Sequence, residues 1–328
     1  MNELPKIVHF RLKYTAKSFG PNINRLIRFP EEGPYFVSVE IGPLLDDELD
    51  SHAVRGDLSC IAEMHSEPTR RIAQWLEGPR RSVPKGFTEF AVEAYDRLSI
   101  SVIRALKLLR WRVGFRGEPN PIKYLRSFEW SADGENWNPI TPGIQLRMEA
   151  GFPTPKVTDE AIMKSVVDLW RGNISEPLSH ELFQEAWGQH LENPRSAIVF
   201  GIAAAETGMK RLISELVPAT EWIMKEIQSP PLTKMLEEYL PLLPTRVKVK
   251  SENLPPLPKD FLATIKKGVK LRNDIVHGQD VRLRPDSVRE ILGAINDVLY
   301  ILDIYSGQLW AEQLLSIEMK IKWLNGAS

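Results

Sequence analysis

Cysteine is nearly absent from this sequence, which contains only Cys60 among 328 residues. A single cysteine excludes an intramolecular disulfide and a zinc site built from several cysteines. Long hydrophobic runs are also missing: no uninterrupted stretch of about 18 apolar residues occurs, so we predict no membrane span. The first residues are charged and alternate in polarity, without the apolar core of a signal peptide. We therefore expect a cytoplasmic protein.

A large excess of charge of either sign is missing as well. Lysine and arginine together number 42, aspartate and glutamate 43, and the formal net charge is −1. This balance argues against a protein that binds nucleic acid over its whole surface, so any contact with RNA must come from a local cluster of basic residues. The sequence has no P-loop, no nucleophile elbow and no dinucleotide-binding glycine motif. ATP hydrolysis and serine hydrolysis are therefore not expected, and no cofactor is predicted.

Most of the histidines lack the spacing of metal ligands. A metal site on a helix usually pairs two histidines four residues apart or combines histidine with cysteine, and neither arrangement occurs here. We therefore predict no metal site. The histidines outside the motif described below are His9, His52, His65, His180 and His190.

The first part of the chain predicts a mixture of strands and helices. Apolar and polar residues alternate over 6–14 and 35–41, which indicates half-buried strands. Apolar residues then recur at steps of three and four over about 88–112, which indicates one long helix. Asp133-Gly134 lies between two tryptophan-containing segments and predicts a hairpin turn. The proline- and glycine-rich stretch 29–34 is typical of a turn.

A proline- and glycine-rich segment around 151–155 predicts a domain boundary, and after it the pattern becomes helical throughout. The expected fold class is α+β: an N-terminal mixed α/β domain of residues 1–152, followed by an all-α helical domain of residues 156–328. Gly278 is expected to cap the helix that precedes it. Helices are expected at 161–170, 179–190, 194–216, 220–227, 232–239, 259–277 and 286–305.

The most distinctive string is Leu271-Arg272-Asn273-Asp274-Ile275-Val276-His277-Gly278. It follows several predicted helices, one of which is alanine-rich and ends its apolar run at Glu206. An arginine followed by a polar residue and, five positions on, a histidine resembles the R-x(4–6)-H signature of the HEPN family. The likeness covers roughly residues 160–310 and leaves the N-terminal part unexplained.

This resemblance implies a helical bundle that dimerises, with the motifs of both copies meeting at a two-fold cleft. It implies a metal-independent endoribonuclease, of the toxin or phage-defence type, that leaves a 2′,3′-cyclic phosphate on RNA. HEPN domains often carry an acidic residue that faces the motif, a place that Glu206 would take. The N-terminal domain would then sense a trigger or select the substrate, and a regulatory partner protein would fit the same scheme.

The residue types of the motif suit this chemistry. Histidine has an unperturbed pKa of about 6.5, so His277 can act as acid or base near neutral pH. Arg272 stays charged and presents a planar fork of donors to phosphate oxygens. Asn273 would orient the phosphate or hold Arg272. Glu206 and Asp274 would support the site.

Helix geometry limits how these residues can meet. Five residues along an ideal helix turn by about 500°, which leaves Arg272 and His277 pointing about 140° apart. A compact site therefore requires the helix to unwind near 274–278, or two chains to contribute.

Two basic clusters are candidates for RNA binding. Lys266 and Lys270 share a helix face with Asn273 and His277, which would guide phosphates. Earlier in the chain, a basic run with interleaved aromatic residues could stack on and follow single-stranded RNA. Its candidate contacts are Arg110, Trp111 and Arg112.

Each of these features also has a purely structural interpretation. A histidine in the last helical turn gains roughly 0.3–1 kcal/mol from the helix dipole. Arg272 can pair with Glu206 or Asp274 inside the bundle, and Glu206 can pair with Arg211. The earlier basic run can be a solvated face. The alternative function is therefore a non-catalytic HEPN-like module for dimerisation or for binding nucleic acid or nucleotides.

Overall fold

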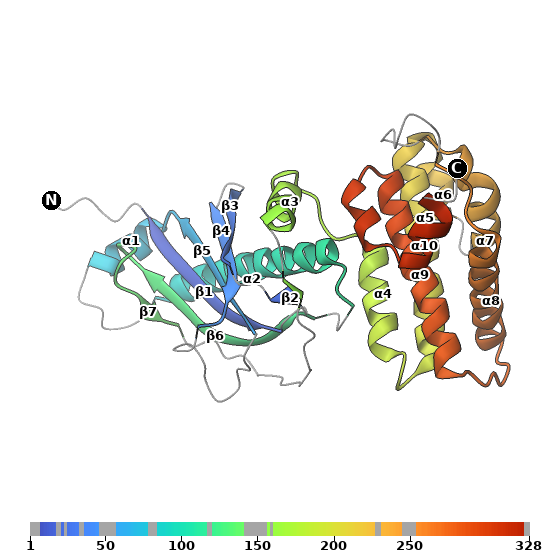
Figure 1. Cartoon of the computed structure of the whole chain (residues 1–328). Helices are drawn as coiled ribbons and strands as arrows, with labels where there is room; N and C mark the ends of the chain where they lie inside the picture. Colours follow the sequence, from blue (N-terminus) through green and yellow to red (C-terminus); the bar gives the residue numbers. More distant parts are fainter. Residues whose placement is uncertain are drawn as a thin grey trace. The chain divides into compact units, whose positions relative to one another are not determined.

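In the computed structural model the chain forms an antiparallel sheet with helices in its N-terminal part and a helical bundle in its C-terminal part (Figure 1). The predicted α+β class is confirmed. Two compact units are present, and each is described by itself: the first holds residues up to Phe115 and from Asn120 to Ser175, the second Arg116–Pro119 and Glu176 onward. The structure describes residues 7–17, 21–22, 25–32, 36–45, 57–77, 84–116, 120–140, 156–157, 160–226, 231–244 and 254–324.

The first unit is built on a sheet whose strand order is β3-β4-β5-β1-β6-β7. Alternation makes these segments strands: in β1 the side chains of Phe10 and Leu12 are buried, while Arg11 and Lys13 between them are half-buried. On the polar face, Arg11 pairs with Glu63 at 2.5 Å. The bounds are β1 Val8–Ala16, β3 Ile27–Glu32, β4 Val37–Pro43, β5 Leu58–Ser66, β6 Ile122–Ser131 and β7 Asn138–Pro139, with β2 Pro21–Asn22 and β8 Lys156–Val157 forming a separate parallel pair.

The long helix α2, Lys85–Val113, packs against this sheet (Figure 1). The rings of Phe10 and Phe90 meet edge to face with centroids 5.2 Å apart. The hydroxyls of Tyr14 and Tyr95 are hydrogen-bonded at 2.8 Å. The predicted helix over 88–112 is therefore confirmed, and it begins three residues earlier than expected. A shorter helix, α1 (Arg70–Glu77), precedes it.

The helix α3, Glu160–Arg171, belongs to the first unit, although the sequence boundary at 152–156 assigns it to the helical domain. Arg104 of α2 donates hydrogen bonds to the backbone carbonyls of Trp170 at 3.0 Å and Ile174 at 3.3 Å. The Trp170 indole N–H donates to the carbonyl of Pro30 at 3.2 Å. These contacts tie α3 to α2 and β3, so the division between the units falls at residue 175.

Strand β3 corrects the predicted turn over 29–32, and the remaining residues of that prediction, 33–34, lie outside the described residues. Ile27 and Phe29 are buried, and they pair across to β4 in antiparallel register. Pro30 has no N–H for a ladder bond, but β3 is the first strand in the sheet order, and proline is tolerated at a sheet edge. The predicted hairpin is confirmed: β6 and β7 pair, and Gly134 between them has a φ of +78°.

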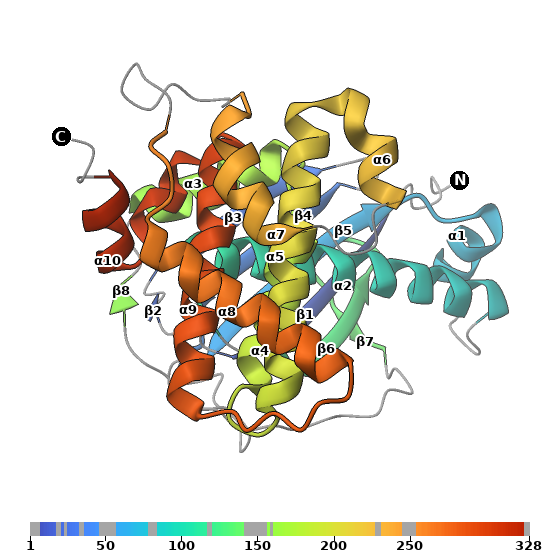
Figure 2. The same ribbon diagram turned by 90° about the vertical axis from the view of Figure 1, so that its right-hand side faces the viewer.

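The second unit is a bundle in which α5 packs against α4, α8 and α9 (Figure 2). Its predicted helices are found within a few residues of their expected bounds. Helix α9 is the most deeply buried, with every side chain from 295 to 305 in the core. The bounds are α4 Leu178–Gln189, α5 Pro194–Leu216, α6 Glu221–Glu226, α7 Leu232–Lys234 with a π-turn Met235–Tyr239, α8 Lys259–Val276, α9 Pro285–Tyr305 and α10 Ile317–Met319.

Glycines let the three central helices approach closely. A Cβ atom added at Gly201 of α5 would lie 2.7 Å from the side chain of Leu292 on α9. One added at Gly268 of α8 would lie 2.8 Å from Ile291 on α9 and 3.1 Å from Ile202 on α5. The α5–α8–α9 junction therefore depends on the absence of these two side chains.

A buried polar network crosses the same core. His180 Nε2 of α4 lies 2.8 Å from Asp303 Oδ2 of α9, and both side chains are almost fully buried. Arg211 of α5 donates to Asp303 Oδ1 at 3.0 Å. The carboxylate of Asp303 thus joins three helices through two charge-assisted contacts. Across the described ranges, no helix combines the length and the apolar character needed to cross a membrane.

Candidate functional site

The motif lies at the C-terminal end of α8, and the sequence explains where this helix begins and ends. The proline-rich segment 254–258 stops before it, and Pro258 takes the N-cap position. At the other end Gly278 has a φ of +77°. Its N–H donates to the carbonyl of Ile275 at 3.0 Å, and the N–H of Gln279 donates to the carbonyl of Asp274 at 2.9 Å. This is a Schellman motif, and the prediction that Gly278 caps the helix is confirmed.

The close approach at Gly268 sets the position of Arg272. Gly268 faces Ile202 on α5, and one helical turn further along both helices come Arg272 and Glu206. These two side chains form an ion pair and hydrogen bond between the Arg272 guanidinium and Glu206 Oε1. Only 16% of the Arg272 side chain and 13% of the Glu206 side chain is exposed. Arg272 is therefore held mostly inside the bundle, and a small part of its side chain is accessible to solvent.

This pair agrees with the expected position of Glu206 facing the motif, and equally with the structural interpretation in which Arg272 is an internal partner of Glu206. The other arginine considered for Glu206, Arg211, forms ion pairs with Asp303 and Glu215. Asp274, predicted as a supporting residue, is half-buried, and its backbone carbonyl takes part in the helix cap.

His277 occupies the C-cap position of α8 and is exposed. Its backbone N–H donates to the carbonyl of Asn273 at 2.9 Å, which fixes where the imidazole leaves the helix. Lys266, Lys270 and Asn273 are exposed as well, so the predicted face is a solvent-exposed row on α8. We call Lys266, Lys270, Asn273 and His277 the outer stripe.

Arg272 and His277 do not point to a common place in one chain. Helix α8 stays regular through Val276 and leaves the helical conformation only at its cap, so it does not unwind between Arg272 and Val276 to bring the two side chains together. On a regular helix their side chains leave about 140° apart, and Arg272 points toward α5 while His277 belongs to the outer stripe. A single chain therefore presents two separate parts of a site.

The prediction that Arg110, Trp111 and Arg112 bind RNA is wrong. Their exposed fractions are 1%, 2% and 4%, so bases and phosphates have no access to them. Arg112 Nε donates to Ser165 Oγ on α3, which packs against α2. These three side chains are buried because α2 packs against both the sheet and α3, and arginine stems pack well against apolar surface.

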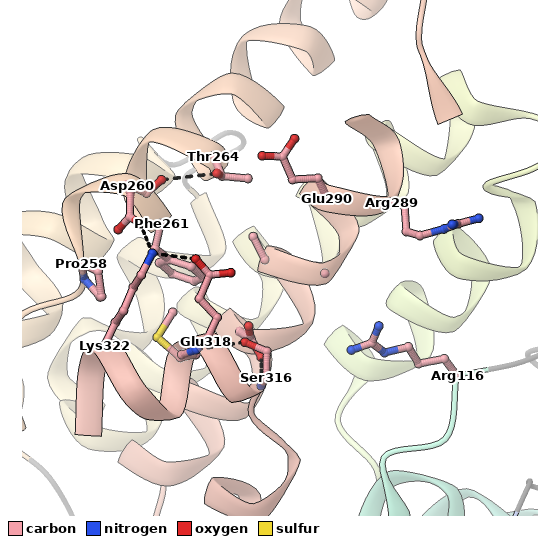
Figure 3. A pocket seen from close by; sticks show the side chains of 14 residues that line it. Arg116, Pro258, Asp260, Phe261, Thr264, Arg289, Glu290, Ser316, Glu318 and Lys322 are labelled. Carbon is pink, nitrogen blue, oxygen red and sulfur yellow. Dashed lines mark hydrogen bonds and ion pairs between the residues drawn. The ribbon is translucent and has the colours of Figure 1, made fainter. Parts of the chain in front are cut away.

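A pocket of about 440 Å3 lies at the opposite end of α8 and was missed by the sequence reasoning (Figure 3). Asp297 of α9 lines it, and its Oδ1 accepts the backbone N–H of Ser316 at 2.8 Å. Burial raises the pKa of the Asp297 carboxyl above its ordinary value. Lys322, which also lines the pocket, pairs with Asp260 and, at 2.6 Å, with Glu318. The carboxylate of Asp297 in the largely apolar segment 295–305 was a signal available in the sequence.

Within the part of the chain that the structure describes, no group of three or more histidine, cysteine, aspartate or glutamate side chains is arranged to hold a metal ion. No protein-family model, no curated protein and no solved structure matches the chain. The likeness to HEPN domains therefore depends on the motif and its helical context alone.

Proposed function

We propose that the helical unit forms a homodimer that cleaves RNA without a metal ion, as a cytoplasmic HEPN-like endoribonuclease of the toxin or phage-defence type. The observation that supports this most is the arrangement at the end of α8. A guanidinium is held in place by a carboxylate, and an exposed imidazole follows it just over one helical turn later. The first unit would sense the trigger or select the substrate, and a regulatory partner protein would act on the same dimer.

In this proposal His277 takes the proton from a ribose 2′-hydroxyl, and the 2′-oxygen attacks the adjacent phosphorus. The bond from phosphorus to the 5′-oxygen breaks, and a protonated imidazole returns a proton to that leaving oxygen. The products are a 2′,3′-cyclic phosphate and a free 5′-hydroxyl. Arg272 stabilises the negative charge that develops on the phosphate oxygens. Such stabilisation is most effective when the guanidinium is already held in position before the reaction. Glu206 holds the Arg272 guanidinium in position, and Asn273 orients the phosphate.

A two-fold dimer would overcome the divergence of Arg272 and His277 that prevents one chain from forming a complete site. In a homodimer, His277 of one copy can approach Arg272 of the other, because across a two-fold axis residue i of one copy meets residue j of its partner, and residue j of the first meets residue i of the second. Lys266 and Lys270 of the outer stripe would then lead the RNA backbone toward this cleft.

The test is an incubation of the purified full chain with total RNA in EDTA, with analysis of the cleaved ends. Wild-type protein should leave cyclic phosphates, and His277→Ala should slow cleavage by about 100-fold or more, the usual contribution of a general acid or base. Arg272→Ala should be similarly slow. Arg282→Ala, which removes an exposed cation outside the motif, is the matched control and should keep full activity. Equal cleavage by all four proteins would show a contaminating nuclease and refute the proposal.

One observation favours a second candidate, a non-catalytic dimerisation or nucleic-acid-binding module. Arg272 already has a carboxylate partner and faces α5, as it would if its role were to hold the bundle. The two candidates differ in the effect of overexpression in a bacterial host. A nuclease should arrest growth, and His277→Ala should relieve the arrest. The phenotype of a binding module should survive this substitution.

A further inference from the structure

The pocket at the N-terminal end of α8 has features of a binding site that the proposed ribonuclease chemistry does not use. Its volume of about 440 Å3 falls in the usual range for small-molecule sites, about 300–1,000 Å3. Its walls come from the start of α8, the middle of α9 and the segment after α9 (Figure 3). Phe261 and Met319 give it apolar surface, and Thr264, Arg289 and Asp297 give it polar groups.

Gly293 gives an independent reason to see this pocket as a site. It lies in the middle of α9, where glycine destabilises a helix relative to alanine. Gly201 and Gly268 have a packing reason, since added Cβ atoms there would meet neighbours at 2.7 and 2.8 Å. An added Cβ at Gly293 would meet nothing within 4 Å, and the residue lines the pocket. The missing side chain keeps the pocket open.

The charged side chains on the pocket walls differ in whether they already have an ion-pair partner within the protein. Lys322 is shared between Asp260 and Glu318, and Glu290 pairs with Lys267 at 3.3 Å. Arg289 is exposed, and among the described residues the structure gives it no ion pair. Asp297 is buried, and one of its carboxylate oxygens accepts a hydrogen bond from the Ser316 N–H. The exposed Arg289 guanidinium therefore lines the same pocket as the Asp297 carboxylate, which also interacts electrostatically with Arg116 on the pocket wall.

We propose that this pocket binds a small amphoteric molecule of the size of a nucleoside monophosphate. Its anionic group is held by Arg289, because a guanidinium fork matches phosphate oxygens. An N–H donor at its other end is bound by Asp297. A flat ring would lie against Gly293 and Phe261, which both line the pocket. The site is separate from the motif, so it would make the helical unit responsive to a ligand whether or not the unit cleaves RNA.

Isothermal titration of the full chain with AMP tests this proposal. AMP should bind saturably and at least about tenfold more tightly than adenosine, which lacks the anionic group, or inorganic phosphate, which lacks the N–H donor. Gly293→Phe fills the pocket and should abolish binding. Gly293→Ala should leave the fold intact with an equal or higher unfolding temperature. Arg289→Gln should reduce the affinity for AMP to about that for adenosine.

Arg272→Ala distinguishes this site from the motif and should bind AMP as wild type does. Saturable AMP binding that Gly293→Phe and Arg289→Gln both weaken supports the pocket. If AMP fails to bind, or binds Gly293→Phe as it binds wild type, the proposal is overturned. If Gly293→Phe fails to fold, unchanged AMP binding by Arg289→Gln overturns it by itself.

Discussion

Arg272 carries a positive charge where water reaches only a small part of its side chain, and Glu206 balances that charge. Whether this pair stabilises the bundle or mainly positions a cation can be measured. Removing one partner leaves the other without a counter-charge in a largely buried place, whereas replacing both by apolar residues of similar size leaves no charge to desolvate.

A double-mutant cycle therefore gives a sharp expectation. Arg272→Met and Glu206→Leu should each lower the free energy of unfolding by about 2 kcal/mol, somewhat less than for a fully buried pair because both side chains retain some exposure. The double variant should lose less than either single variant. Urea unfolding measures all four proteins. Strictly additive losses would show that the two side chains do not interact.

Asp303 is the more deeply buried carboxylate, and it serves two partners from two helices. Asp303→Ala should reduce the free energy of unfolding by about 3–5 kcal/mol, because it leaves the buried His180 and the Arg211 guanidinium without their shared acceptor. Glu215→Ala, which removes a more exposed partner of Arg211, should reduce it by about 0–1 kcal/mol. Chemical denaturation followed by circular dichroism checks both. Equal losses would contradict the central position of Asp303.

His9 on β1 links the stability of the first unit to pH. Desolvation lowers its pKa below the ordinary 6.5, with the neighbouring His65 as the second cause. The unfolded chain therefore takes up a proton more readily than the folded one, and this contribution to stability is complete above about 6.5 and lost as the pH falls toward the lower folded pKa. His9→Gln should flatten the loss of stability between pH 7.5 and 5.5. An unchanged pH dependence in this variant would refute the link.

At the scale of elements, the local sequence pattern was enough to predict most helices but not the strands at the edges of the sheet. Helix α9 shows an apolar stripe and Gly278 a cap, so both could be predicted from neighbouring residues alone. Strand β3 could not, because Pro30 and the acidic residues after it read as a turn unless the strand is known to lie at an edge. The same limit applies to Arg110 and Arg112: only the packing of the sheet and of α3 on α2 shows that they are buried.

The two glycines of the bundle core and pocket should respond oppositely to the same substitution. Gly268→Ala places a methyl group 2.8 Å from Ile291 and should cost about 1–3 kcal/mol through overpacking. Gly293→Ala meets nothing within 4 Å and should stabilise by about 0.5–1 kcal/mol through helix propensity. Thermal unfolding of the two variants provides the comparison. Stabilisation by both would show that α8 and α9 are not packed as tightly as described.

At the scale of the whole molecule, the sequence revealed the motif but not whether one chain holds a complete site. Spacing alone predicted that Arg272 and His277 diverge on a regular helix, and α8 is regular. No property of one sequence shows whether a second copy supplies the missing half, because that depends on a surface formed only after folding. The central claim is therefore that two chains complete one site.

Mixing two inactive variants tests this claim most directly. Arg272→Ala chains retain His277, and His277→Ala chains retain Arg272, so a mixed dimer has one intact site only if the two groups come from different copies. After joint refolding, the mixture should recover about a quarter of wild-type RNA cleavage in EDTA, since about half of the dimers are mixed and each carries one intact site of two. Cleavage no greater than that of the separate variants, under conditions where wild type is active, would contradict a site shared between two chains.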